Sequence, residues 1–135
     1  MADFRAVTDA FSVSSQLTIE DLKLAAERGF KTIICNRPDN EERGQAEIAT
    51  LKAEAESLGL RFLVLPFSGG PTPEIADQQG ILIANAENPV LAYCRSGTRS
   101  IAAWALSQRG TGQRDTILNQ AADAGYDLRS LAAAL

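Results

Sequence analysis

Short apolar runs alternate with longer stretches of helical periodicity along most of this chain. The runs Lys31–Cys35, Arg61–Leu65 and Val90–Tyr93 are bounded by turn-forming residues and predict three buried strands. Phe4–Val7 and Ala10–Val13 are candidates for two further short strands. Apolar residues that recur every three or four positions predict helices over residues 19–29, 45–58, 73–86, 100–108, 114–124 and 128–134.

Strands that alternate with helix-sized segments are typical of parallel strands joined by crossover helices. The expected fold class is therefore α/β, with a central, mainly parallel sheet flanked by helices, in a single domain over residues 1–135. Ligands bind beyond the carboxyl ends of the strands in such sheets, so the loops after Cys35, Leu65 and Cys94 should converge on one crevice. The first two of these loops contribute Arg37, a candidate for touching a bound anion, and the weaker candidates Asp39, Ser68, Gly69 and Gly70.

Cys94 stands where the last of these strands ends and a helix is about to begin. Unpaired backbone N–H groups and the helix dipole favour negative charge at that place. Arg95 and Arg99 add two cations within the same loop. We therefore expect a Cys94 thiolate at neutral pH that acts as a nucleophile. The alternative is a cysteine that only fills the core at the end of a strand.

The other residues of the loop favour the nucleophile. Gly97 allows a tight turn and a close approach to a ligand. Thr98 and Ser100 offer hydroxyl groups and a helix cap, and Arg99 presents a fork of donors to an anion. Together with Ser96, these residues predict an anion-binding loop around Cys94.

Composition narrows the possible chemistry. The 135 residues carry a net charge of −4 and include two cysteines and no histidine. The acidic balance argues against nucleic acid as a partner, and no apolar run is long enough to span a bilayer. Without histidine, a Ser-His or Cys-His dyad is excluded and a typical zinc site lacks ligands, so we expect neither metal nor cofactor. The N-terminus lacks the pattern of a secretion signal, and two cysteines make no disulfide framework, which favours a cytoplasmic location.

The segment from Cys94 to Ser100 resembles the active-site loop of rhodanese-type sulfurtransferases. With four further segments it also resembles the bacterial phosphatase-like domain of beta-lactamase hydrolase-like proteins. Those segments are Thr18–Asp21, Asn36–Asp39, the glycines after Pro66, and Ala124–Asp127. The resemblance implies a fold like that of dual-specificity phosphatases. Members of this family are described as hydrolases or sulfurtransferases, and some relatives are fused or linked to persulfide-oxidising metalloenzymes.

The length of the loop favours sulfur transfer over ester hydrolysis. Four residues separate Cys94 from Arg99, whereas the loop of cysteine-based phosphatases has five. A shorter ring of N–H groups suits the single added sulfur of a persulfide better than a phosphoryl group. Residues 61–66 hold no carboxylate to protonate a leaving group, and Asp39, Glu74 and Asp77 are weak substitutes. Tyr93 also stands where the phosphatase pattern has a histidine.

The sequence therefore predicts a sulfurtransferase that works through a Cys94 persulfide. Its expected donor is a small anionic sulfur compound, thiosulfate or a small persulfide, and its acceptor is a thiol. A persulfide-oxidising metalloenzyme is a candidate partner. Three alternatives stay open: a phosphatase-like hydrolase with a phosphocysteine intermediate, a non-catalytic sensor of persulfides or anions, and an arsenate reductase that would need Cys35 within disulfide distance.

Overall fold

A five-stranded sheet runs through the centre of the computed structural model, which describes residues 2–135. Its strands lie in the order β1-β2-β5-β3-β4. Strand β1 is antiparallel to β2, and the remaining neighbours are parallel. The strands are β1 (Arg5–Thr8), β2 (Phe11–Ser14), β3 (Thr32–Cys35), β4 (Arg61–Val64) and β5 (Val90–Tyr93).

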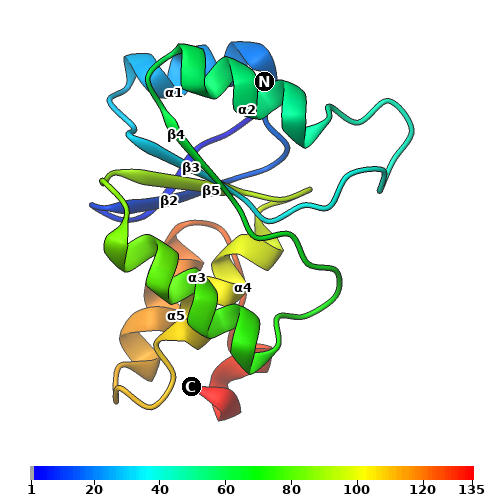
Figure 1. Cartoon of the computed structure of the whole chain (residues 1–135). Helices are drawn as coiled ribbons and strands as arrows, with labels where there is room; N and C mark the ends of the chain where they lie inside the picture. Colours follow the sequence, from blue (N-terminus) through cyan, green and yellow to red (C-terminus); the bar gives the residue numbers. More distant parts are fainter. Residues whose placement is uncertain (1) are drawn as a thin grey trace.

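Helices cover both faces of this sheet (Figure 1). On one face lie α1 (Ile19–Glu27) and α2 (Ile48–Ser57). On the other lie α3 (Pro73–Asn85), α4 (Thr98–Ser107), α5 (Arg114–Asp123) and a 3-10 helix, η1 (Arg129–Ala134). Two hydrophobic clusters fill the spaces between the sheet and its helical layers. The predicted α/β fold class is confirmed.

The helix starts follow from local capping. Thr18 accepts the Asp21 N–H through its side chain, and Asp21 returns a bond to the Thr18 N–H, so α1 begins with a capping box. Thr72 caps α3, whose first residue is Pro73. Gly80 of α3 has no Cβ to collide with Ser107, which lets α3 and α4 pack closely.

Two predicted helix starts and one predicted helix type are wrong. Helix α2 begins at Ile48 and not at Gln45, because Asp39 Oδ1 accepts the Ile48 N–H at 2.9 Å and the Gln45 side chain binds the Pro38 carbonyl instead. Helix α4 begins at Thr98, so neither Thr98 nor Ser100 is its cap. The last segment is a 3-10 helix, the form that very short helical pieces commonly take.

Strand register brings the site together. Strands β2, β3 and β5 are parallel neighbours, and Tyr93 lies opposite both Ser14 and Cys35. The loops that follow these three strands therefore leave the sheet at the same edge, on the side where the long loop after β3 projects in Figure 1.

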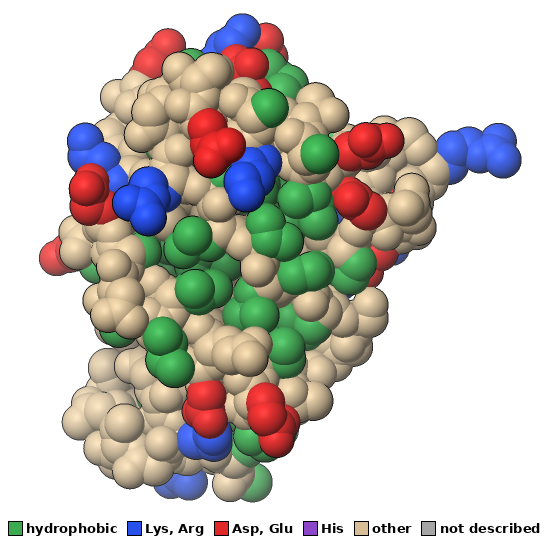
Figure 2. All heavy atoms as spheres, viewed as in Figure 1, with side chains coloured by type: hydrophobic (Ala, Val, Ile, Leu, Met, Phe, Trp, Pro, Cys, Tyr) green, Lys and Arg blue, Asp and Glu red, His purple; other side chains and the backbone are tan. Residues whose placement is uncertain are grey.

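Strand β4 forms one edge of the sheet. Figure 2 shows apolar side chains gathered across the middle of the face on which β4 and α3 lie. Val64 of β4 and Ile81 of α3 are exposed large hydrophobic residues, at 41% and 60%. Among residues 2–135, no helix combines the length and the apolar character needed to cross a membrane.

Candidate active site

Cys94 follows β5 directly and has no exposed surface. Its sulfur accepts a hydrogen bond from the Gly97 N–H, with an N···Sγ distance of 3.1 Å. The loop is tied to the chain after β2: the Cys94 N–H donates to the Ser14 carbonyl at 3.4 Å, and the Gln16 N–H donates to the Arg95 carbonyl at 3.2 Å. The loop thus turns around the sulfur and aims at least one backbone donor at it.

Gly97 makes this turn possible. Its φ is +94°, in the left-handed region, and it is the N-cap of α4. A Cβ at this position would collide with the hydroxyl of Tyr126. That hydroxyl donates to the Ser96 carbonyl at 2.9 Å, so Tyr126 holds the outside of the loop. Tyr126 was not among the predicted site residues, although its segment contributed to the family resemblance.

We expect Gly97→Ala to lower the free energy of unfolding by about 2 kcal/mol or more, because strain and collision act together. Gly112→Ala is the matched control: its φ is +78° but open space surrounds it, so the expected loss is about 1 kcal/mol. Urea unfolding of both variants checks the difference. Equal losses would show that Tyr126 does not constrain the loop.

Arg99 lies in the first turn of α4, and its guanidinium is held by Glu41 and by the Phe67 carbonyl. Nη1 and Nη2 donate to the two carboxylate oxygens of Glu41 at 2.7 and 2.8 Å, and Nη1 also donates to the Phe67 carbonyl at 2.9 Å. Glu41 first, and then the nearby Cys94, raise the pKa of Arg99. No carbonyl or carboxylate oxygen of residues 2–135 binds Nε. Within the described part of the chain, Nε is therefore a free donor on an arginine that lies close to Cys94.

Glu41 is a second residue beside the Cys94 loop, after Tyr126, that the sequence did not predict. It lies in the loop after β3, and Arg37 Nε donates to it at 2.9 Å in addition to the two bonds from Arg99. These arginines, Arg99 before Arg37, lower the pKa of Glu41 to about 2. The Glu41 carboxylate therefore stays ionised at physiological pH and fixes the position of the Arg99 guanidinium. A sequence signal for Glu41 existed, because the loop after Cys35 was already expected to line the crevice at the carboxyl ends of the strands.

Arg37 binds the carboxylates of the loop after β3 and helps to hold Glu41 in place. Its side chain is only 3% exposed. Each guanidinium nitrogen donates to a different side chain: Nε to Glu41, Nη1 to Gln16 at 3.1 Å and Nη2 to Glu42 at 3.2 Å. In this structure Arg37 thus orders two carboxylates beside the loop, and each of its three nitrogens already has a side-chain acceptor.

The remaining predicted residues lie around the loop at different depths. The Arg95 side chain is 70% exposed, and its only ion-pair contact among residues 2–135 is 4.0 Å from Glu42. The hydroxyls of Ser96 and Thr98 lie 3.0 Å apart on the exposed side. Ser100 is fully buried, and its hydroxyl has no hydrogen-bond partner among the described residues. An unpaired buried hydroxyl costs about 1–3 kcal/mol and is available to a bound ligand.

We expect Ser100→Ala to leave the free energy of unfolding unchanged or raise it by up to about 1 kcal/mol, because an unpaired hydroxyl is removed. Turnover should nevertheless fall by roughly tenfold if that hydroxyl serves the bound anion. Thermal unfolding and kcat, measured on the same preparation, check the two effects. A less stable variant with full activity would contradict this role.

The acids and the second cysteine considered from sequence have other partners. Asp39 caps α2, and Asp77 pairs with Arg109 at 3.0 Å. Glu74 is exposed in the first turn of α3. Cys35 is a free, buried thiol that donates to the Arg37 carbonyl at 3.3 Å, and burial raises its pKa. Within residues 2–135, no cluster of three or more acidic or cysteine side chains is arranged to hold a metal ion.

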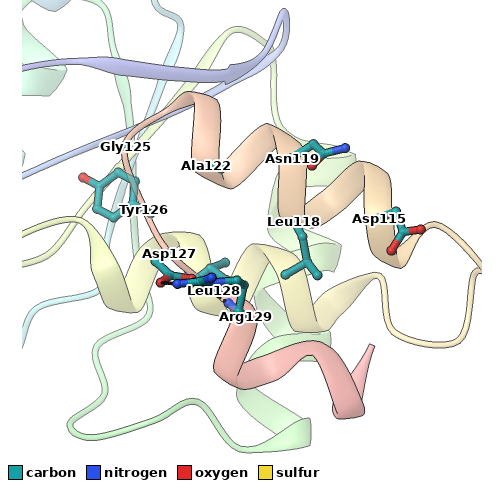
Figure 3. Close-up of a pocket in the computed structure, with 9 residues that line it drawn as sticks. All are labelled: Asp115, Leu118, Asn119, Ala122, Gly125, Tyr126, Asp127, Leu128 and Arg129. Atoms are coloured by element: carbon teal, nitrogen blue, oxygen red, sulfur yellow. Dashed lines mark hydrogen bonds and ion pairs between the residues drawn. The ribbon is translucent and has the colours of Figure 1, made fainter.

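A cavity of about 760 Å³ lies between α5 and the start of η1, and none of the predicted site residues lines it. Figure 3 shows Tyr126 at one end of this cavity, with its hydroxyl turned away from Asp127 and Arg129. The hydroxyl bonds Ser96 instead, so the cavity is separated from the Cys94 loop by the Tyr126 ring.

Comparisons with known proteins agree with this architecture. The chain is 34% identical over 126 residues to a beta-lactamase hydrolase-like protein of Agrobacterium fabrum, which covers 90% of this chain and 29% of that protein. It is 36% identical to a Neisseria meningitidis protein described as a candidate phosphatase, with a TM-score of 0.87 over 96% of this chain and 93% of the other. Pseudomonas aeruginosa TpbA, solved with phosphotyrosine, shares the fold at 17% identity, with a TM-score of 0.69 over 96% and 80% of the two chains.

This chain thus spans less than a third of the length of that curated relative. Its fold is like that of dual-specificity phosphatases, as the resemblance implied. The family described as "Beta-lactamase hydrolase-like protein, phosphatase-like domain" matches residues 3–111. The chain belongs to this family.

Proposed function

We propose that this chain is a cysteine-dependent phosphatase that hydrolyses phosphate monoesters through a phosphocysteine at Cys94. The observation that carries the proposal is the Cys94 loop itself: a sulfur that receives the Gly97 N–H at 3.1 Å, beside an arginine fixed by a paired carboxylate. The description of the Neisseria relative as a candidate phosphatase supports the same reaction.

The reaction needs two displacements at phosphorus. The Cys94 thiolate attacks phosphorus, the P–O bond to the leaving group breaks, and the leaving oxygen takes a proton from solvent. Water then attacks the phosphocysteine, the P–S bond breaks, and inorganic phosphate leaves with Cys94 again a thiolate. Arg99 and the N–H groups of the loop stabilise the charge on the phosphoryl oxygens in both steps.

The leaving group receives little help from the protein. Glu41 is ionised, with a pKa near 2, and is engaged by Arg99 and Arg37, so it is a poor acid at neutral pH. We therefore expect kcat/KM to fall steeply as the leaving-group pKa rises, by more than about a hundredfold between 4-nitrophenyl and alkyl phosphates. A series of phosphate esters measured at one pH checks this. A flat dependence would point to a general acid that this account lacks.

Sulfur transfer is the second candidate, and the four-residue spacing between Cys94 and Arg99 favours it. In this reaction the Cys94 thiolate attacks the sulfane sulfur of thiosulfate, the S–S bond breaks, and sulfite leaves. An acceptor thiolate then takes the outer sulfur and releases the Cys94 thiolate. A persulfide-oxidising metalloenzyme would be a fitting partner for this reaction. We place either reaction in the cytoplasm, where thiols such as Cys94 and Cys35 stay reduced.

A parallel assay separates the two candidates. Purified protein receives 4-nitrophenyl phosphate in one arm and thiosulfate with a thiol acceptor in the other, and Cys94→Ser is the control in both. The phosphatase proposal predicts Cys94-dependent phosphate release. Cys94-dependent sulfite release without phosphate release would replace it with sulfur transfer, and binding without turnover in either arm would favour a sensor.

A further inference from the structure

Two cavities of opposite charge flank the Cys94 loop. One, of about 520 Å³, lies in the loop after β3 and is lined by three carboxylates, Glu41, Glu42 and Glu47, against one arginine. The other, of about 320 Å³, is lined by Arg5 and Arg95 against one carboxylate. We call the second cavity the Arg5–Arg95 pocket. It is also lined by Asp3, Ser15, Ser96 and Tyr126.

The pocket adjoins the nucleophile loop. Arg95 and Ser96, which line it, are the two residues that follow Cys94 in the chain. Arg95 is 70% exposed and makes only a distant contact with Glu42, which leaves its guanidinium free to turn toward a ligand. Ser96 presents a hydroxyl to the exposed side of the loop.

Arg5 is held in place at the far wall of the pocket. Nη1 donates to the Ala124 carbonyl at 3.0 Å, the guanidinium carbon lies 5.8 Å from the centre of the Tyr126 ring, and Nε is 3.3 Å from Asp3. Among residues 2–135, Nη2 has no partner. An arginine fixed by a backbone carbonyl and an aromatic ring keeps that donor in position for an anion.

We propose that the Arg5–Arg95 pocket binds a second anionic group, a phosphate or a carboxylate, of a small substrate whose first phosphate lies at Cys94. The inference rests on the proposed phosphatase function. The volume of the pocket suits one anionic group with the few atoms that link it to the reacting phosphate.

Calorimetry with phosphonates tests the pocket without turnover. The ligands are benzylphosphonate and its 3-carboxy and 3-aminomethyl derivatives, at pH 8 and low salt. We expect the carboxylate to bind roughly three- to tenfold more tightly than the parent and the amine more weakly. This advantage should shrink to less than about twofold in Arg5→Gln and Arg95→Gln, grow in Asp3→Asn, and stay unchanged in the control Arg43→Gln, which lies on the acidic flank.

Equal binding of the parent and the carboxylate would overturn the proposal, and so would an advantage that survives both arginine variants. Far-ultraviolet circular dichroism confirms that the variants are folded. Hydrolysis of the matching phosphate esters distinguishes a failure of the pocket proposal from a failure of the phosphatase function. If phosphonates bind in the expected order but no ester is hydrolysed, the phosphatase function fails and the pocket remains. If esters are hydrolysed without preference for the carboxylate, only the pocket fails. If no phosphonate binds at millimolar concentration, the pocket proposal fails, and ester hydrolysis alone decides the phosphatase function.

Discussion

Cys94→Ser lowers phosphate-ester turnover by at least about a thousandfold, because a serine hydroxyl is not ionised at neutral pH and the loop offers no base to activate it. The substitution changes one atom in a buried position and keeps the Gly97 N–H donor, so the fold should persist. Release of inorganic phosphate from 4-nitrophenyl phosphate measures the loss.

Cys35→Ser is the matched control. Cys35 is equally buried, but its thiol bonds the Arg37 carbonyl. We expect it to keep turnover within about threefold of the native protein, with only a modest loss of stability. Comparable losses in both variants would indicate that Cys35 shares in the chemistry, as a second thiol of a redox pair would.

Arg99→Lys lowers kcat/KM by about a hundredfold or more, although the positive charge is kept. A lysine offers one compact ammonium, which cannot donate to both Glu41 oxygens and the Phe67 carbonyl while also facing an anion at the sulfur. The Glu41 carboxylate then loses its bidentate partner near the site. Steady-state kinetics with the same aryl phosphate measure the effect.

Arg109→Lys provides the comparison for Arg99. Arg109 lies just beyond the end of α4 and also pairs with a carboxylate, Asp77, but it is outside the Cys94 loop. Its kcat/KM should stay within about twofold of the native value. If Arg99→Lys behaved like Arg109→Lys, the guanidinium fork would not be part of the anion site.

The parts of the site that could be predicted are contiguous in sequence. Cys94, Gly97 and Arg99 belong to one strand-loop-helix segment, so a strand end and a glycine were enough to place them together. The sheet could be predicted for a similar reason, because each buried strand is a short apolar run between helix-sized segments. The start of α4 could not be predicted. Gly97, with its positive φ, is the N-cap, so the helix begins two residues earlier than the apolar pattern indicated.

The parts that could not be predicted depend on distant contacts. Arg99 and Glu41 are 58 positions apart, and Tyr126 and Ser96 are 30 apart. Asp39 of the β3–α2 loop could be named as a candidate acid from the sequence, but it binds the Ile48 N–H, and no local pattern indicates that Glu41 of the same loop pairs with Arg99. The length of the Cys94 loop does not by itself separate sulfur transfer from ester hydrolysis, because four intervening residues still allow an arginine and a backbone N–H to lie beside the sulfur.

Mass spectrometry of the intermediate tests the central claim most directly. Protein mixed with 4-nitrophenyl phosphate is denatured within one turnover at neutral pH, digested and analysed. The account predicts an added mass of about 80 Da, one phosphoryl group, on the peptide that contains Cys94, and none in Cys94→Ser. Phosphate release without that adduct, or an adduct of about 32 Da that forms only with a sulfane-sulfur donor, would contradict it.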